Sequence, residues 1–217
     1  MAKCRVLIVD DHHVVIDGIK STLAAYPEFE TVGEATNGRE AVKQVRLLNP
    51  DIVIMDISMP DLNGIDAALQ IRTFNPDTRI VVFTMYSDGE YVRDLLKAGI
   101  SAYILKEDPM SDLVKAIHAV RKGETFMGAV MPGILSTRNR ASEEHENARD
   151  GFGDLSLRER EVLQLIAEGN SIKDIAGKLT LSPKTIESHK YHIMQKLGIA
   201  TLADMTKTAI KKKLIKA

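Results

Sequence analysis

Five polar residues in the first half of the sequence each stand at or just after the end of a short apolar run: Asp10, Asp11, Asp56, Thr84 and Lys106. The apolar runs are Arg5–Val9, Ile52–Met55, Ile80–Thr84 and Ala102–Leu105. Short, nearly continuous apolar runs are typical of strands buried on both faces of a parallel sheet. Because ligands bind outside the carboxyl ends of such strands, we expect the five side chains to meet at one edge of the sheet.

The residue types at this edge favour phosphoryl chemistry. Three carboxylates close together repel one another, so the arrangement predicts a cation among them, and oxygen-only ligands favour Mg²⁺, Mn²⁺ or Ca²⁺ over zinc. The metal and Lys106 would neutralise the oxygens of a phosphoryl group, and a carboxylate would act as its nucleophile. A single Asp at a strand end is most often only a turn former or helix cap. Five such residues at one edge favour a functional site.

The elements that position these residues alternate between strands and helices. A fifth apolar run covers Glu30–Glu34, and the helical patterns between the runs cover residues 13–25, 38–48, 64–74, 89–98 and 109–121. Asp108 is expected to cap the last of these helices, with Pro109 at its first position. Five strands that alternate with five helices predict an α/β domain with a doubly wound, five-stranded parallel sheet.

Other phosphate-handling folds fit the sequence less well. It lacks a G-x-x-x-x-G-K-[ST] loop, and no G-x-G-x-x-G follows the first strand, so a P-loop nucleotidase and a dinucleotide site are both disfavoured. A Mg²⁺-dependent phosphohydrolase that uses Asp56 is the rival enzyme hypothesis. Such an enzyme would usually have a carboxylate two residues after the nucleophile, where this sequence has Ser58.

The second half of the sequence predicts a small helical domain. Residues 128–152 are mostly polar or small after Leu135 and are expected to form a linker between a domain at 1–127 and a domain at 153–217. Four helical patterns follow, at 157–168, 172–179, 184–197 and 202–213. Ser156 and Glu159 form a capping-box pattern before the first of them.

The second and third of these helices have the form of a helix–turn–helix. Such a motif needs two short helices joined by a tight turn, and the second helix presents polar residues of its N-terminal part to the DNA major groove. In the third helix, Ile186, Ile193, Met194 and Leu197 are expected to pack inward. A solvated polar face on a small bundle is the alternative interpretation of the opposite side.

The strand-end residues lie within longer segments that resemble the CheY-like receiver domain of two-component response regulators, from residue 3 to about 124. The segments are Val-Asp10-Asp11-His, Met55-Asp56-Ile-Ser58-Met-Pro60 with Asn63-Gly64, Phe83-Thr84 and Tyr103-Ile-Leu-Lys106. The resemblance implies that Asp56 is the phosphoacceptor, that Thr84 and Tyr103 are switch residues, and that Lys106 binds the phosphate. It also implies a set of Mg²⁺ ligands: Asp10, Asp11, Asp56 and the backbone carbonyl of Ser58. Glu107 departs from the proline that many receivers carry after the lysine.

Residues 153–215 resemble the LuxR-type helix–turn–helix, through Leu-Ser-x-Arg-Glu-x-Glu-Val-Leu163, Thr185-Ile-Glu-Ser-His189 and Lys196-Leu-Gly. Together the two halves resemble the NarL/FixJ family of transcriptional response regulators. The resemblance implies a phosphoacceptor transcription regulator rather than an enzyme, with a sensor histidine kinase, double-stranded promoter DNA and a second copy of itself as partners. The candidate DNA-contact residues are Lys184, Thr185, Glu187, Ser188, Lys190 and Tyr191.

Composition and charge agree with this organisation. Residues 152–217 hold 12 Lys and Arg against 7 Asp and Glu, a net charge of +5, while residues 1–151 have a net charge of −6. This asymmetry indicates a basic domain that meets a polyanion and an acidic domain that does not. The single cysteine excludes an internal disulfide, and no stretch approaches a membrane span, so we expect a cytoplasmic protein. Opposite net charges predict weak docking of the domains. The sequence does not decide whether the unphosphorylated receiver inhibits or assists DNA binding by the second domain.

Overall fold

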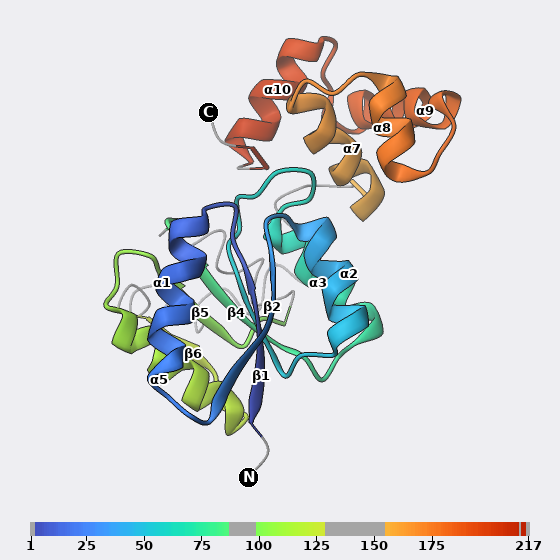
Figure 1. The fold of residues 1–217 in the computed structure, drawn as a ribbon. Coiled ribbons are helices and arrows are strands. Elements are labelled where there is room, and N and C mark those ends of the chain that lie inside the picture. The colour runs from blue at the N-terminus through green and yellow to red at the C-terminus, as the bar shows by residue number, and fades with distance from the viewer. Residues whose placement is uncertain (1–2, 87–98, 129–154, 213, 216–217) are drawn as a thin grey trace, which may run out of the picture.

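The computed structural model describes residues 3–86, 99–128, 155–212 and 214–215, and Figure 1 shows them as a sheet domain followed by a helical domain. The helix expected at 89–98 lies outside the described residues. So does the expected linker, apart from residue 128.

The first domain is built on a fully parallel sheet. Its strands are β1 (Cys4–Val9), β2 (Phe29–Ala35), β3 (Ile52–Met55), β4 (Arg79–Thr84), β5 (Ala102–Leu105) and β6 (Phe126–Met127). The strand order is β2-β1-β3-β4-β5-β6, and every neighbouring pair is parallel. The doubly wound parallel sheet is therefore confirmed, with one strand more than the five expected. The strand order reverses between β1 and β3, so their carboxyl ends flank the crevice where such folds bind ligands.

Helices cover both faces of the sheet, as Figure 1 shows: α1 (His13–Ala24) and α5 (Met110–Arg121) on one face, α2 (Gly38–Leu48) and α3 (Gly64–Phe74) on the other. Side chains along β1 alternate between two cores. Val6 and Ile8 belong to the core under α1 and α5, whereas Leu7 and Val9 belong to the core under α2 and α3. This period of two is the direct result of strand geometry.

The N-terminus of α3 packs tightly against the strand that carries Asp56. A Cβ atom added at Gly64 would lie 2.0 Å from the backbone oxygen of Asp56, so only glycine fits at this position. The Gly64 N–H donates a hydrogen bond of 2.7 Å to the backbone oxygen of Ile57. This contact fixes the start of α3 beside the end of β3.

The second domain contains α7 (Leu157–Ala167), α8 (Ile172–Leu179), α9 (Pro183–Leu197) and α10 (Leu202–Lys211) around one apolar core. The expected capping box of Ser156 and Glu159 is present at the start of α7. The expected cap of α5 is wrong, because Pro109 itself is the N-cap residue and Asp108 accepts a hydrogen bond of 3.0 Å from the Leu105 N–H. None of the helices in the described part of the chain is both long and apolar enough to cross a membrane.

Candidate functional site

The carboxyl ends of β1, β3 and β5 bring two buried carboxylates and one lysine into contact. The Nζ atom of Lys106 lies 2.6 Å from Oδ2 of Asp10 and 2.8 Å from Oδ2 of Asp56. The other oxygen of Asp56 accepts a hydrogen bond of 2.6 Å from the Ile57 N–H. Both carboxylates are buried, at 1% and 4% exposure, so Lys106 supplies charge compensation that water does not.

The charge of Lys106 is strongly favoured at this position. Burial alone would lower the pKa of its ammonium group, but the carboxylates of Asp56 and Asp10 outweigh burial, and the pKa is raised. Lys106 therefore stays protonated at physiological pH. A permanent cation beside a carboxylate nucleophile can neutralise the oxygens of a phosphoryl group as that group is transferred.

A second group of ligand atoms faces the same crevice. Asp10, Asp11, His12 and Asp56 each offer one ligand atom, and these atoms lie within 4.8 Å of one another. The Nδ1 atom of His12 lies 2.7 Å from Oδ1 of Asp11. Three of the four groups are carboxylates, the oxygen donors that Mg²⁺ prefers, so the residues fit this ion.

Three further predicted site residues line the same end of the sheet. Thr84 is fully buried at the end of β4, and its hydroxyl is a buried polar atom for which the described residues provide no hydrogen-bond partner. Tyr103 is buried in β5, and its hydroxyl group donates to the backbone oxygen of Tyr86. Ser58 is buried just beyond β3 and lines a cleft with Asp11. A buried hydroxyl such as that of Thr84 is suited to bind an incoming oxygen atom.

The candidate DNA-contact residues lie on α9. Ser182 caps the helix by accepting from the Thr185 N–H, and Pro183 occupies the first turn. Ile186 and Ile193 are buried in the core of the domain, while Met194 and Leu197 pack partly against it. This side of α9 therefore packs inward as expected.

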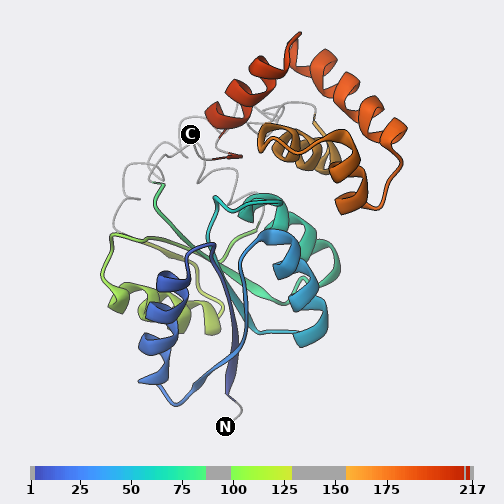
Figure 2. The same cartoon turned by 45° about the horizontal axis from the view of Figure 1, so that its top comes forward.

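The opposite side of α9 is open to solvent. Lys184, Glu187, Ser188 and Tyr191 are exposed, and Thr185 and Lys190 are half-buried. The Tyr191 ring is 60% exposed although it is large and partly apolar. Figure 2 shows α9 on the side of the helical domain that lies away from the sheet domain.

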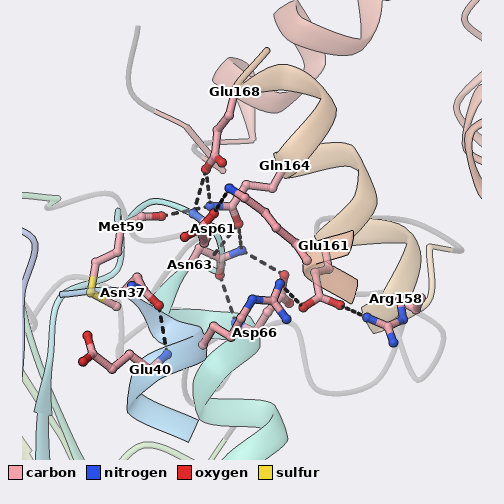
Figure 3. A network of polar contacts seen from close by, with 12 residues as sticks. Asn37, Glu40, Met59, Asp61, Asn63, Asp66, Arg158, Glu161, Gln164 and Glu168 are labelled. Carbon is pink, nitrogen blue, oxygen red and sulfur yellow. Dashed lines mark hydrogen bonds and ion pairs between the residues drawn. The ribbon is translucent and has the colours of Figure 1, made fainter. Parts of the chain in front are cut away.

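The two domains meet near the strand-end site through polar contacts, and Figure 3 shows a network of them in detail. The sheet domain contributes α2, the loop from β3 to α3 and the first turn of α3, and the helical domain contributes α7 and α8. Arg39 pairs with Glu161 at 2.8 Å, and Arg160 lies 3.6 Å from Asp66. Lys178 of α8 pairs with Asp61.

Sequence reasoning missed several residues that the structure brings to these sites. His12 joins the acidic cluster, and Gln164, Glu168 and Asn63 form the contact between domains. Asn63 is part of the segments that resemble a receiver domain, but that resemblance predicted no contact between Asn63 and the second domain. A single polar residue on a helix carries no periodic signal for what it contacts, so Gln164 and Glu168 could not be found in this way.

Comparisons with known proteins identify both domains. Residues 6–118 match the response regulator receiver domain family, and residues 154–209 match the bacterial regulatory proteins of the luxR family. The chain is 40% identical over 214 residues to the oxygen regulatory protein NreC of Staphylococcus carnosus (strain TM300), which covers 97% of this chain and 99% of that protein. The corresponding NreC of Staphylococcus aureus (strain JH9) is 39% identical over the same length.

Solved structures of similar architecture include DNA complexes. The RcsB response regulator of Salmonella typhimurium is 31% identical with a TM-score of 0.59, covering 96% of this chain and 98% of that one. A structure of the RcsB–DNA complex is 30% identical with a TM-score of 0.59, covering 94% and 96%. Another structure contains two RcsB dimers bound to two parallel DNAs. The chain is a two-component response regulator that binds DNA, and it belongs to the NarL/FixJ family, in which a receiver domain precedes a LuxR-type helix–turn–helix domain.

Proposed function

We propose that Asp56 accepts a phosphoryl group from a sensor histidine kinase and that the modified protein regulates transcription at promoter DNA. The observation that carries this proposal is the position of Lys106 Nζ, which contacts Asp56 Oδ2 at 2.8 Å. At the end of the neighbouring strand β4, Thr84 adds a buried hydroxyl for which the described residues provide no hydrogen-bond partner. Together they provide a nucleophile, a cation and a hydrogen-bond donor at one edge of the sheet.

In the transfer step an oxygen of Asp56 forms a bond to phosphorus while the bond between phosphorus and the donor breaks. Lys106 Nζ binds an oxygen of the transferred group, and the Thr84 hydroxyl donates to another. Tyr103, which is already turned inward, acts as a second switch residue. A Mg²⁺ ion held by Asp10, Asp11, Asp56 and the Ser58 carbonyl would neutralise charge on the phosphoryl oxygens.

The test of this assignment is phosphorylation by acetyl phosphate in the presence of Mg²⁺. The protein should gain one phosphoryl group, and Asp56→Asn should gain none. Stoichiometric labelling of the Asp56→Asn variant at another residue would refute the assignment. Turnover of small phosphate esters in solution would favour the phosphohydrolase hypothesis instead, whereas this proposal predicts only self-phosphorylation and slow loss of the phosphoryl group.

We further propose that α9 is the recognition helix and enters the major groove. Its exposed face carries Lys184, Glu187, Ser188 and Tyr191, with Thr185 and Lys190 at its margins. In a double-stranded operator, lysines that contact phosphates would release counterions, and each such contact steepens the salt dependence of binding by about one unit.

The matched experiment compares two double variants of equal charge. Lys184→Ala/Lys190→Ala should weaken operator binding and flatten its salt dependence. Lys115→Ala/Lys122→Ala removes the same charge from the receiver, where both residues are exposed, and should leave the salt slope unchanged. Equal slopes for both double variants would show that α9 is not the helix in the groove.

The proposal also includes the domain boundaries, a homodimer and a location in the cytoplasm. A receiver over residues 1–127, a linker over 128–152 and a DNA-binding domain over 153–217 agree with the end of β6 at Met127 and the start of α7 at Leu157. A homodimer that forms on phosphorylation or on DNA would place two recognition helices on paired half-sites, an arrangement consistent with the DNA-bound dimers of RcsB. A protein that works on promoter DNA in this way acts in the cytoplasm.

A further inference from the structure

One side chain of the DNA-binding domain bonds to two separate residues of the loop that follows the phosphoacceptor. Gln164 of α7 is completely buried. Its Nε2 group donates a hydrogen bond of 2.9 Å to the backbone oxygen of Met59. Its Oε1 atom accepts from the backbone N–H of Asn63 at 2.9 Å and from the Asn63 side chain at 3.1 Å. Figure 3 shows how Gln164 spans this loop.

A second side chain of the same domain contacts the middle of the loop. Oε1 of Glu168 accepts from the Asp61 N–H at 3.0 Å and from Gln164 Nε2 at 2.9 Å. Asp61 has a left-handed backbone conformation with φ at 65°, which few residues other than glycine adopt without support. Gln164 and Glu168 therefore satisfy three backbone groups of a loop that begins directly after Asp56. We call this pair of side chains the loop clamp.

Glu168 of the clamp also lines a cleft at the edge of the phosphoryl site. The cleft has a volume of about 320 Å³ and is lined by residues of both domains, among them the predicted Mg²⁺ ligands Asp11 and Ser58: Asp11, Ser58, Met59, Pro60, Ala167, Glu168 and Ile215. The receiver contributes the first four of these and the DNA-binding domain the last three. Glu168 thereby adds a carboxyl group to an entrance that already contains the carboxylate of Asp11. Every phosphoryl donor brings negative charge to this entrance.

We propose that the docked DNA-binding domain gates entry of the phosphoryl group, and that Gln164 is the positioning residue of this gate. The inference rests on the proposed role of Asp56. Tyr191 of α9 is 60% exposed in the docked structure, so docking does not cover this part of the DNA-contact face. The effect of docking is therefore exerted on the phosphoryl site. Because coupling between two sites is reciprocal, a phosphoryl group on Asp56 would in turn weaken docking.

The test is the rate at which the full-length protein is phosphorylated by acetyl phosphate with Mg²⁺. In this reaction an Asp56 oxygen bonds to phosphorus and acetate leaves. If only the undocked state reacts, the apparent rate is proportional to its fraction, so Gln164→Ala should react about tenfold faster than the unmodified protein. Gln195→Ala, an exposed glutamine on α9, is the matched control and should react at the unmodified rate.

A second variant separates charge from geometry. Glu168→Gln keeps an oxygen to accept from Asp61 but removes the negative charge from the cleft. It should react about twofold faster at low ionic strength and lose this advantage at about 1 M salt, where exposed charges are screened. In Gln164→Ala, hydrogen exchange should quicken at the Asp61 and Asn63 amides while the amides of α7 to α10 keep their protection.

The outcomes distinguish the gate from the phosphorylation site itself. A rate for Gln164→Ala at or below that of Gln195→Ala overturns the gate, provided that Asp56→Asn remains unlabelled. Labelling of Asp56→Asn overturns the proposed phosphoacceptor instead. General loss of amide protection in α7 to α10 would mean that the DNA-binding domain of Gln164→Ala has unfolded. In that case the salt-dependent rate of Glu168→Gln decides whether the gate exists.

Discussion

Asp66 in the first turn of α3 is a completely buried carboxylate at the contact between domains. Burial raises its pKa from 3.8 to about 6, although the Asn63 side chain at 2.9 Å and Arg160 at 3.6 Å act in the opposite direction. Glu161, which faces the same group from α7, raises the pKa further. We predict that Asp66→Asn stabilises the protein near neutral pH, because asparagine resembles the neutral acid without its charge.

The magnitude follows from the two pKa values. A carboxyl group whose pKa is higher in the folded state than in the unfolded state contributes most to stability below pH 4, and that contribution is lost as pH rises to about 6. The complete loss is about 3 kcal/mol, at about 1.4 kcal/mol for each pH unit between the values. Between about pH 4.5 and pH 7.5 the loss is about 2 kcal/mol. A charge in the first turn of a helix regains only about 0.5 kcal/mol from the helix dipole.

Urea unfolding followed by circular dichroism measures this effect, since the chain has no tryptophan to report by fluorescence. The quantity of interest is the difference in the free energy of unfolding between Asp66→Asn and the unmodified protein at about pH 4.5 and about pH 7.5. Comparing this difference at two pH values cancels the effect of exchanging one hydrogen-bonding group for another. Asp77→Asn, at an exposed carboxylate, is the control.

We expect the Asp66→Asn difference to grow by about 2 kcal/mol toward neutral pH, whereas the Asp77→Asn difference stays constant. A difference for Asp66→Asn that is the same at both pH values would refute the reasoning. It would show that Arg160 compensates the buried charge fully, so that burial of Asp66 brings no penalty.

Further predictions concern the two functional sites. Lys106→Met should destabilise the receiver by about 3 kcal/mol, because it leaves Asp10 and Asp56 buried beside each other without a cation. Millimolar Mg²⁺ should restore part of this loss in thermal melts, and a melt insensitive to Mg²⁺ would argue against an ion at the carboxylates. Gly64→Ala should abolish labelling by acetyl phosphate, because its methyl group would overlap the Asp56 backbone; full labelling would mean that α3 can shift. Tyr191→Ala should weaken operator binding by about tenfold with an unchanged phosphorylation rate, and unchanged affinity in a mobility shift would remove Tyr191 from the DNA interface.

The strand-end site could be predicted from the sequence because two simple regularities combine in it. Short apolar runs mark strands that are buried on both faces, and the carboxyl ends of parallel strands share an edge. Asp10, Asp56 and Lys106 were therefore expected together despite their distance in sequence, and the structure brings them within ion-pair distance. The helical spacing of apolar residues in α9 likewise predicted which side of that helix packs inward.

The remaining features depend on contacts that leave no periodic pattern. Strand β6 has only two residues, too few for an alternation to be recognised. Asp108-Pro109 has the composition of a helix start, but Asp108 bonds to the Leu105 N–H instead, a choice that depends on how the chain leaves β5.

The hydrogen bonds of Gln164 restrict how freely these two domains can be exchanged between related regulators. A receiver and a DNA-binding domain taken from different parents would each fold on its own core and keep its own chemistry. Unless position 164 matched the backbone groups of residues 59 and 63, however, such a hybrid would lack the contact through which one half informs the other. Recombination could then yield a protein that is phosphorylated and binds DNA, yet responds to no signal.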